Sequence, residues 1–175
     1  MATIRRASAY SKMHVVPYTR VSKLKGRSYI KTVPPQKIVK FKTGKEGAYP
    51  HRLIAIALHD SQLRDSALEA CRQYITKKLD ISFPGQYFFN VVPFPHHIQR
   101  ENKMLSMAGA DRLSTGMQLS FGRAISKAAL VKEGSPVFRF ELPNARAVEL
   151  ARELISQIRS KIPVKLRVLY EEVKK

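Results

Sequence analysis

The sequence has few acidic residues, a single cysteine and no tryptophan. Only 13 Asp and Glu residues stand against 32 Lys and Arg residues, so the formal net charge is +19 over 175 residues. The lone cysteine, Cys71, excludes an intramolecular disulfide and a zinc site made of several cysteines. It also favours a reducing compartment. No apolar run approaches the roughly 18 residues that a membrane-spanning helix needs.

The excess of positive charge points to a polyanionic partner, because a folded chain with this charge repels itself. Nucleic acid is the first candidate and an anionic membrane surface the second. Residues 1–52 contain 13 Lys and Arg residues against one acid, Glu46. A mitochondrial-type transit peptide is the weaker interpretation of this segment, because Pro17, Pro34 and Pro35 interrupt any amphipathic helix.

Residues 1–36 are predicted to form a basic arm, since they show no hydrophobic period of a helix or a strand. Two interpretations stay open: a solvated, disordered arm, or an extended arm that becomes ordered against phosphates. In the second, cations neutralise the RNA backbone while tyrosines stack on unpaired bases. The residues predicted to bind RNA in this arm are Arg5, Arg6, Lys12, Tyr18, Arg20, Lys23, Lys25, Arg27 and Lys31.

Residues 37–175 are predicted to form one α+β domain: a mixed, mostly antiparallel sheet with two helices packed on it. The expected strands are 38–41, 52–58, 87–92, 128–131, 137–142 and 164–170, with a turn at 133–136 and a frayed tail from 171. One helix is expected from Gln62 to about Leu79, capped by Asp60 or Ser61, with Cys71 as a buried structural thiol. Another follows Asn144, with an apolar stripe at Val148, Ala151, Leu154, Ile155 and Ile158.

Residues 94–127 are expected to be a long inserted loop, and loops of this length are usually functional or disordered. They contain no recognisable catalytic constellation. His96 and His97 are adjacent, so they do not have the spacing of a helical metal-ligand pair. The segment between Gly109 and Gly116 lacks the lysine and hydroxyl of a phosphate-binding loop. The sequence therefore predicts no enzyme, no metal, no cofactor and no small-molecule substrate.

The same segment resembles a known family. Arg100-Glu101-Asn102-Lys103, Ala108-Gly109-Ala110-Asp111-Arg112, Gly116-Met117 and Phe121-Gly122 are similar to the universal large-subunit ribosomal protein family numbered sixteen in bacteria and ten-e in archaea and eukaryotes. A weaker resemblance extends to Pro17-Tyr18-Thr19-Arg20 and Leu68-Glu69-Ala70. The pattern places the chain in the archaeal or eukaryotic branch, and an archaeal source is expected.

The resemblance implies a fold of the α/β-hammerhead type and a structural role in the large ribosomal subunit, in the cytoplasm. The implied partners are large-subunit rRNA near the peptidyl-transferase region, neighbouring ribosomal proteins and, transiently, tRNA. It implies that a flexible loop lies near tRNA, with the residues Asn102, Lys103, Met104, Ala108, Gly109, Ala110, Asp111, Arg112 and Gly116. On the loop flank, His97, Arg100, Arg123 and Lys127 are predicted to bind rRNA. The alternative is a free-standing RNA-binding module outside the ribosome.

One departure from the family pattern affects this flank. The family has glycine and threonine where this sequence has Ser126 and Lys127. Loss of the glycine leaves the path of the chain after Gly122 open at this stage.

Overall fold

The computed structural model describes residues 6–11, 15–20, 22, 24–28, 30–101 and 122–172. Its larger sheet has five strands in the order β1 (Lys42–Gly44), β4 (Phe88–Val91), β7 (Pro136–Leu142), β2 (His51–Ala57) and β8 (Leu166–Glu172). Every neighbouring pair in it is antiparallel. The α+β class predicted from the sequence is therefore confirmed.

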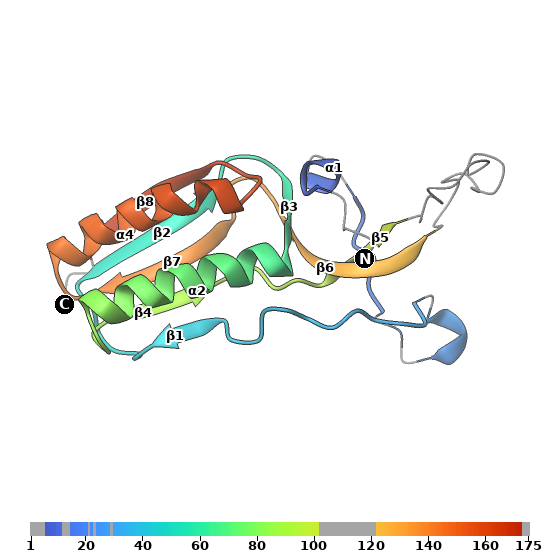
Figure 1. Ribbon diagram of the computed structural model, residues 1–175, viewed down its shortest axis with the longest axis horizontal. Coiled ribbons are helices and arrows are strands. Elements are labelled where there is room, and N and C mark those ends of the chain that lie inside the picture. Colours follow the sequence, from blue (N-terminus) through green and yellow to red (C-terminus); the bar gives the residue numbers. More distant parts are fainter. Residues whose placement is uncertain are drawn as a thin grey trace.

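Two helices lie side by side across one face of this sheet, α2 (Asp65–Ser82) and α4 (Ala145–Gln157), as Figure 1 shows. The short 3-10 turn η2 (Ile158–Lys161) continues α4. All five residues of the stripe predicted for the second helix are buried. Asn144 occupies the predicted N-cap position of α4, although its side chain accepts no capping hydrogen bond from the first turn. Cys71 is a buried free thiol, as predicted, and burial raises its pKa to about 12.

Aromatic side chains fill the middle of the larger sheet beneath the helices. Phe89 on β4 packs against Phe138 and Phe140 on β7, with ring centroids 5.8 Å and 4.8 Å away. Phe89, Phe138 and Phe140 are fully buried. Because Phe89 and Phe140 are also register partners, the two strands share one cluster of side chains at the core.

A second sheet of three strands replaces much of the predicted long loop. Its order is β3 (Ser61–Arg64), β6 (Arg123–Val131) and β5 (His97–Glu101), again antiparallel throughout. The loop prediction for 94–127 was therefore wrong at both ends, because these residues pair with each other across the segment. Residues 102–121, which carry the predicted tRNA loop, lie outside the described residues.

The second sheet also explains two errors in the predicted elements. The helix was expected from Gln62, but Ser61–Arg64 pairs with Ala128–Val131 and the helix begins at Asp65. Strands β6 and β7 follow each other in the chain but belong to different sheets.

The first strand was placed three to four residues too early, since Ile38 and Phe41 pack on the core before β1 starts at Lys42.

The end of the chain differs from the prediction as well. Glu171 and Glu172 were expected to be frayed, yet they complete strand β8 and pair with Arg52 and His51 of β2. Arg52 lies within ion-pair distance of Glu141 on one side and Glu171 on the other, at 3.6 Å and 3.7 Å. The charges of the tail thus join three strands on the sheet face that the helices leave open.

Gly122 is required by the close approach of strands β5 and β6. Its φ is +123°, and an added Cβ would lie 3.2 Å from the carbonyl carbon and oxygen of Glu101. We expect Gly122→Ala to lower the free energy of unfolding by about 1–3 kcal/mol through backbone strain and crowding. Gly134→Ala is the matched control, because Gly134 also has a positive φ but faces open space. Equal losses in urea denaturation of the two variants would contradict a role for the contact with Glu101.

Candidate nucleic-acid interface

The arm does not hang free; its backbone packs on the outer edge of strand β5. The Tyr18 amide donates to Nδ1 of His97 at 2.9 Å, and the Ile98 amide donates to the Tyr18 carbonyl at 2.9 Å. Figure 1 shows the arm, in blue, gathered around β5 and β6 beyond the helices. Because β5 uses its other edge to pair with β6, the Tyr18 carbonyl occupies one position on the free edge of the second sheet.

Two tyrosines of the arm pack against arginines of the folded part. The Arg100 guanidinium carbon lies 3.9 Å from the centroid of the Tyr18 ring, and that of Arg64 lies 5.1 Å from the Tyr10 ring. The Tyr10 hydroxyl also donates to Oε2 of Glu101 at 3.4 Å. These cation–π contacts hold the arm in place. The tyrosines predicted to stack on bases therefore have protein partners of their own.

Arg20, predicted to bind RNA, forms hydrogen bonds within the arm. Its Nε donates to the Ser28 hydroxyl at 2.7 Å and its Nη1 to the Lys31 carbonyl at 3.2 Å. These bonds close the segment between Arg20 and Lys31, which contains the 3-10 turn η1 (Lys25–Arg27). Arg20 thus positions the arm. The side chains of Arg6, Arg27 and Lys31 are exposed and remain available to a phosphate.

The join between arm and domain depends on Asp65, which is buried at the start of α2. Its Oδ2 accepts from the Lys37 amide at 2.9 Å and its Oδ1 from the Ser66 amide at 2.7 Å. An anionic side chain at a helix N-terminus is favoured by the free amides there. The carboxylate therefore fixes where the arm leaves the domain, while the Lys37 side chain stays exposed.

On the loop flank, three of the four predicted RNA-binding residues keep accessible surface. Arg123 is exposed, and Arg100 and Lys127 are half-buried. His97 is only 5% exposed, and its Nδ1 already accepts the Tyr18 amide. The side chain of His97 therefore has little surface to offer a phosphate and instead positions the arm.

Burial lowers the pKa of His97 to about 4, and the nearby His96 and Arg100 lower it further. Between pH 6.5 and about 4 the unfolded chain binds a proton there that the folded chain does not, so stability falls as the pH falls through this window. We expect His97→Asn, which keeps an acceptor without titrating, to reduce this pH dependence in thermal unfolding. His59→Asn, at an exposed position, is the control. An unchanged pH profile in the His97 variant would contradict the assignment.

A buried polar network supports the three-stranded sheet, and sequence reasoning missed it. Oε1 of Gln99 accepts from Nε of Arg64 at 3.1 Å and from the Ser126 hydroxyl at 2.9 Å. Nε2 of Gln99 donates to Oε1 of Gln62 at 3.0 Å. The members of the network come from all three strands of the sheet, which are distant in sequence, so no local sequence signal could have found it. The network gives Ser126 a role, because its buried hydroxyl donates to Gln99 on the neighbouring strand.

A β-bulge at Ile125 lies near the ends of strands β5 and β6 that adjoin residues 102–121. Gln99 is the register partner of Ser126, but Arg100 is the partner of Ala124, so Ile125 is the extra residue. Bulges increase local twist and change the direction of the neighbouring side chains. Here the change lies beside Arg100 and Arg123, the two arginines that flank the undescribed segment.

Several predicted site residues lie outside the described residues, and their prediction stays a prediction. They are Arg5, Lys12 and Lys23 of the arm and Asn102, Lys103, Met104, Ala108, Gly109, Ala110, Asp111, Arg112 and Gly116 of the loop. Lys25 is described and lies in η1. Within the part of the chain that the structure describes, no group of three or more His, Cys, Asp or Glu side chains could hold a metal ion. No described helix is long and apolar enough to cross a membrane.

The fold and this surface define an α+β protein whose basic arm is fixed on a small sheet and carries exposed cations. A family model described as ribosomal protein L16p/L10e matches residues 13–169. A protein named large ribosomal subunit protein uL16 from Thermofilum pendens is 39% identical over 171 residues, 97% of this chain and 98% of the relative. Proteins of the same name from Staphylothermus marinus and Nanoarchaeum equitans are 38% and 36% identical over 98% and 99% of this chain.

The chain belongs to the ribosomal protein L16p/L10e family, in its archaeal branch. It is a structural constituent of the cytoplasmic ribosome and not an enzyme. Membership implies association with rRNA and with other ribosomal proteins. The resemblance carried by the Arg100–Lys103 and Ala108–Arg112 motifs is confirmed.

Proposed function

We propose that this protein is a constituent of the large ribosomal subunit and binds large-subunit rRNA through its arm and the flank of strands β5 and β6. One observation carries the proposal. An arm without acidic residues is fixed by side-chain contacts to a small sheet, and its cations Arg6, Arg27 and Lys31 are exposed. Such an arrangement places positive charge along an RNA backbone with little loss of conformational entropy on binding.

The internal contacts of the arm support an ordered binding surface over a disordered one. Tyr10, Tyr18 and Arg20 form contacts within the protein itself. Arg6, Arg27, Lys31, Lys37 and Lys40 are exposed, and they supply the charge. Some residues of this segment thus hold it on the protein, while other residues carry the exposed positive charge.

Sedimentation of a native lysate through sucrose tests the proposal, at low salt and after a high-salt wash. We expect the protein to travel with the large subunit and to resist the wash. If it stays at the top of the gradient, large-subunit membership fails. If the wash removes it, the alternative of a free-standing RNA-binding module gains support, because charge alone then holds the protein on RNA.

The position near the peptidyl-transferase region and the transient contact with tRNA form the finer part of the proposal. They rest on the family resemblance of residues 102–117. A chain lacking residues 104–113 should still enter the subunit, because the arm contacts lie elsewhere, but it should bind tRNA poorly or mature late. Normal tRNA binding by subunits that contain this shortened chain would contradict the loop assignment.

A further inference from the structure

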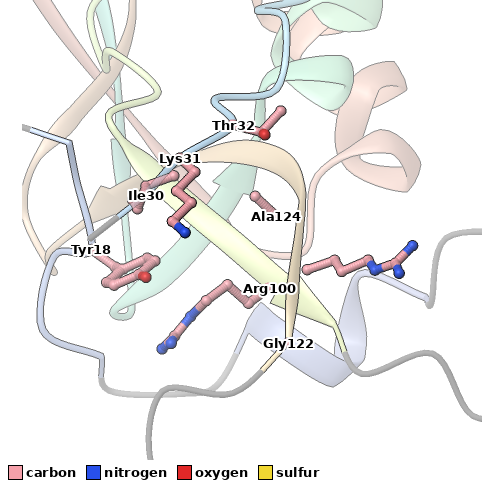
Figure 2. A pocket seen from close by; sticks show the side chains of 8 residues that line it. Tyr18, Ile30, Lys31, Thr32, Arg100, Gly122 and Ala124 are labelled. Atoms are coloured by element: carbon pink, nitrogen blue, oxygen red, sulfur yellow. The ribbon is translucent and has the colours of Figure 1, made fainter. Parts of the chain in front are cut away.

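A hollow of about 450 Å³ lies between the arm and the start of strand β6. Four residues of the arm, Arg100 of β5 and the first residues of the returning chain line it. Figure 2 shows Lys31 and Arg100 extending toward Tyr18 from different segments. The hollow therefore exists only because the arm is packed against β5 and β6.

The charge of the lining selects an anion. Lys31, Arg100 and Arg123 contribute three cations, and no lining residue is acidic. Nη1 of Arg100 is buried and has no hydrogen-bond partner among the described residues. A buried guanidinium donor without a partner is costly, and a phosphate oxygen is the acceptor that guanidinium groups bind well.

The hollow is larger and more apolar than a site for phosphate alone needs to be. The volume falls within the range of pockets that enclose an organic ligand. Ile30, only 4% exposed, and Ala124 contribute apolar surface, while Tyr18 and Arg100 form a stacked pair of planar groups. Aromatic rings and guanidinium planes are the groups on which nucleic-acid bases stack.

We propose that this hollow receives one unpaired nucleotide of RNA, with its base against the Tyr18 ring and its phosphate facing Lys31 and Arg100. The inference rests on the proposed function and adds to it a preference for an extruded nucleotide. A fully paired duplex keeps its bases stacked inside the helix and offers only phosphates to the same surface. The site therefore separates RNA with a bulge or a single-stranded turn from RNA of the same charge without one.

The test compares the purified full chain on two RNAs, a short duplex and the same duplex with one extra unpaired nucleotide, using each of the four bases in turn. We expect at least one bulged RNA to bind about fivefold or more tightly than the duplex. Ala124→Leu fills the hollow without changing charge and should abolish the preference while keeping duplex affinity. Ala145→Leu, at an exposed position on α4, is the matched control and should keep both.

A second pair of variants tests the phosphate. Lys31→Gln should weaken binding to the bulged RNA more than to the duplex. Lys165→Gln, exposed and outside the hollow, should affect both RNAs equally. If Ala124→Leu unfolds, Thr32→Leu at the rim replaces it. Equal effects of Lys31→Gln on the two RNAs would overturn the placement of the phosphate.

The remaining outcomes distinguish a failure of the proposed rRNA binding from a failure of the nucleotide site alone. If the wild-type chain binds neither RNA, the proposed function itself fails. If it binds both equally, or if both filled variants keep the preference, rRNA binding stands and the nucleotide site is overturned. If a free nucleoside monophosphate displaces the bulged RNA completely at equal concentration, the occupant is a free nucleotide and the assignment to RNA is overturned.

Discussion

Replacing Arg6, Arg27, Lys37 and Lys40 together by glutamine should strongly weaken binding to large-subunit rRNA. All four side chains are exposed, and none lines the hollow. If each contacts one phosphate, the slope of log affinity against log salt should become shallower by about 3 to 4. Between 50 and 200 mM salt the variant should then lose roughly 100-fold less affinity than the wild type. Filter binding over a salt series measures this slope.

The matched control carries the same charge change elsewhere. Lys77, Lys78, Arg159 and Lys165 are exposed on or next to the helices. A variant with these four residues changed to glutamine should keep most of the slope, because we place them outside the interface. If both variants lose the same amount, net charge alone governs binding, and the arm is not a specific surface.

Phe140→Ala should give the largest loss of stability among single changes. The side chain is fully buried, and its ring lies 4.8 Å from that of Phe89. Truncating a buried phenylalanine costs about 3–5 kcal/mol, since both transfer free energy and a cavity are involved. For a chain of this length that corresponds to a fall in Tm of roughly 10 °C. Calorimetry of the isolated protein gives the value.

Phe94 offers a control with the same side chain on the surface. It is 55% exposed and stacks on Phe41 with centroids 5.5 Å apart. Phe94→Ala should cost about 1 kcal/mol or less. A comparable loss in both variants would mean that the Phe89, Phe138 and Phe140 cluster is not the stabilising centre of the sheet.

The parts of the fold that local patterns determine could be predicted from the sequence. The stripe from Val148 to Ile158 has helical spacing and Asn144 marks its start, so the start of α4 was predicted correctly, while the last turn before Pro163 is the 3-10 turn η2. The start of α2 was wrong because Leu63 also fits the helical spacing. Its actual role follows from pairing with Ala129, which is distant in sequence. The existence of two sheets depends on such pairs of residues distant in sequence, and the hydrophobic periodicity of a single segment cannot reveal them.

The candidate site divides in the same way. The charge of the arm and its aromatic residues are visible in the sequence, and so are the motifs that carry the family. The sequence does not show that Arg20 bonds to Ser28 and Lys31, or that Arg100 stacks on Tyr18. It also gives no sign that His97 is buried and accepts a backbone amide. These roles arise only when the arm meets β5.

The backbone hydrogen bond between Tyr18 and Ile98 of strand β5 has a consequence for the chain before it enters the ribosome. An uncovered strand edge is a template for pairing with another molecule and thus for aggregation. The Tyr18 carbonyl occupies part of that edge by accepting from the Ile98 amide, while the Tyr18 amide donates to the His97 side chain. The arm also surrounds the edge with like charges, which repel a second copy. We therefore expect the segment proposed to bind RNA also to disfavour self-association of the newly made chain.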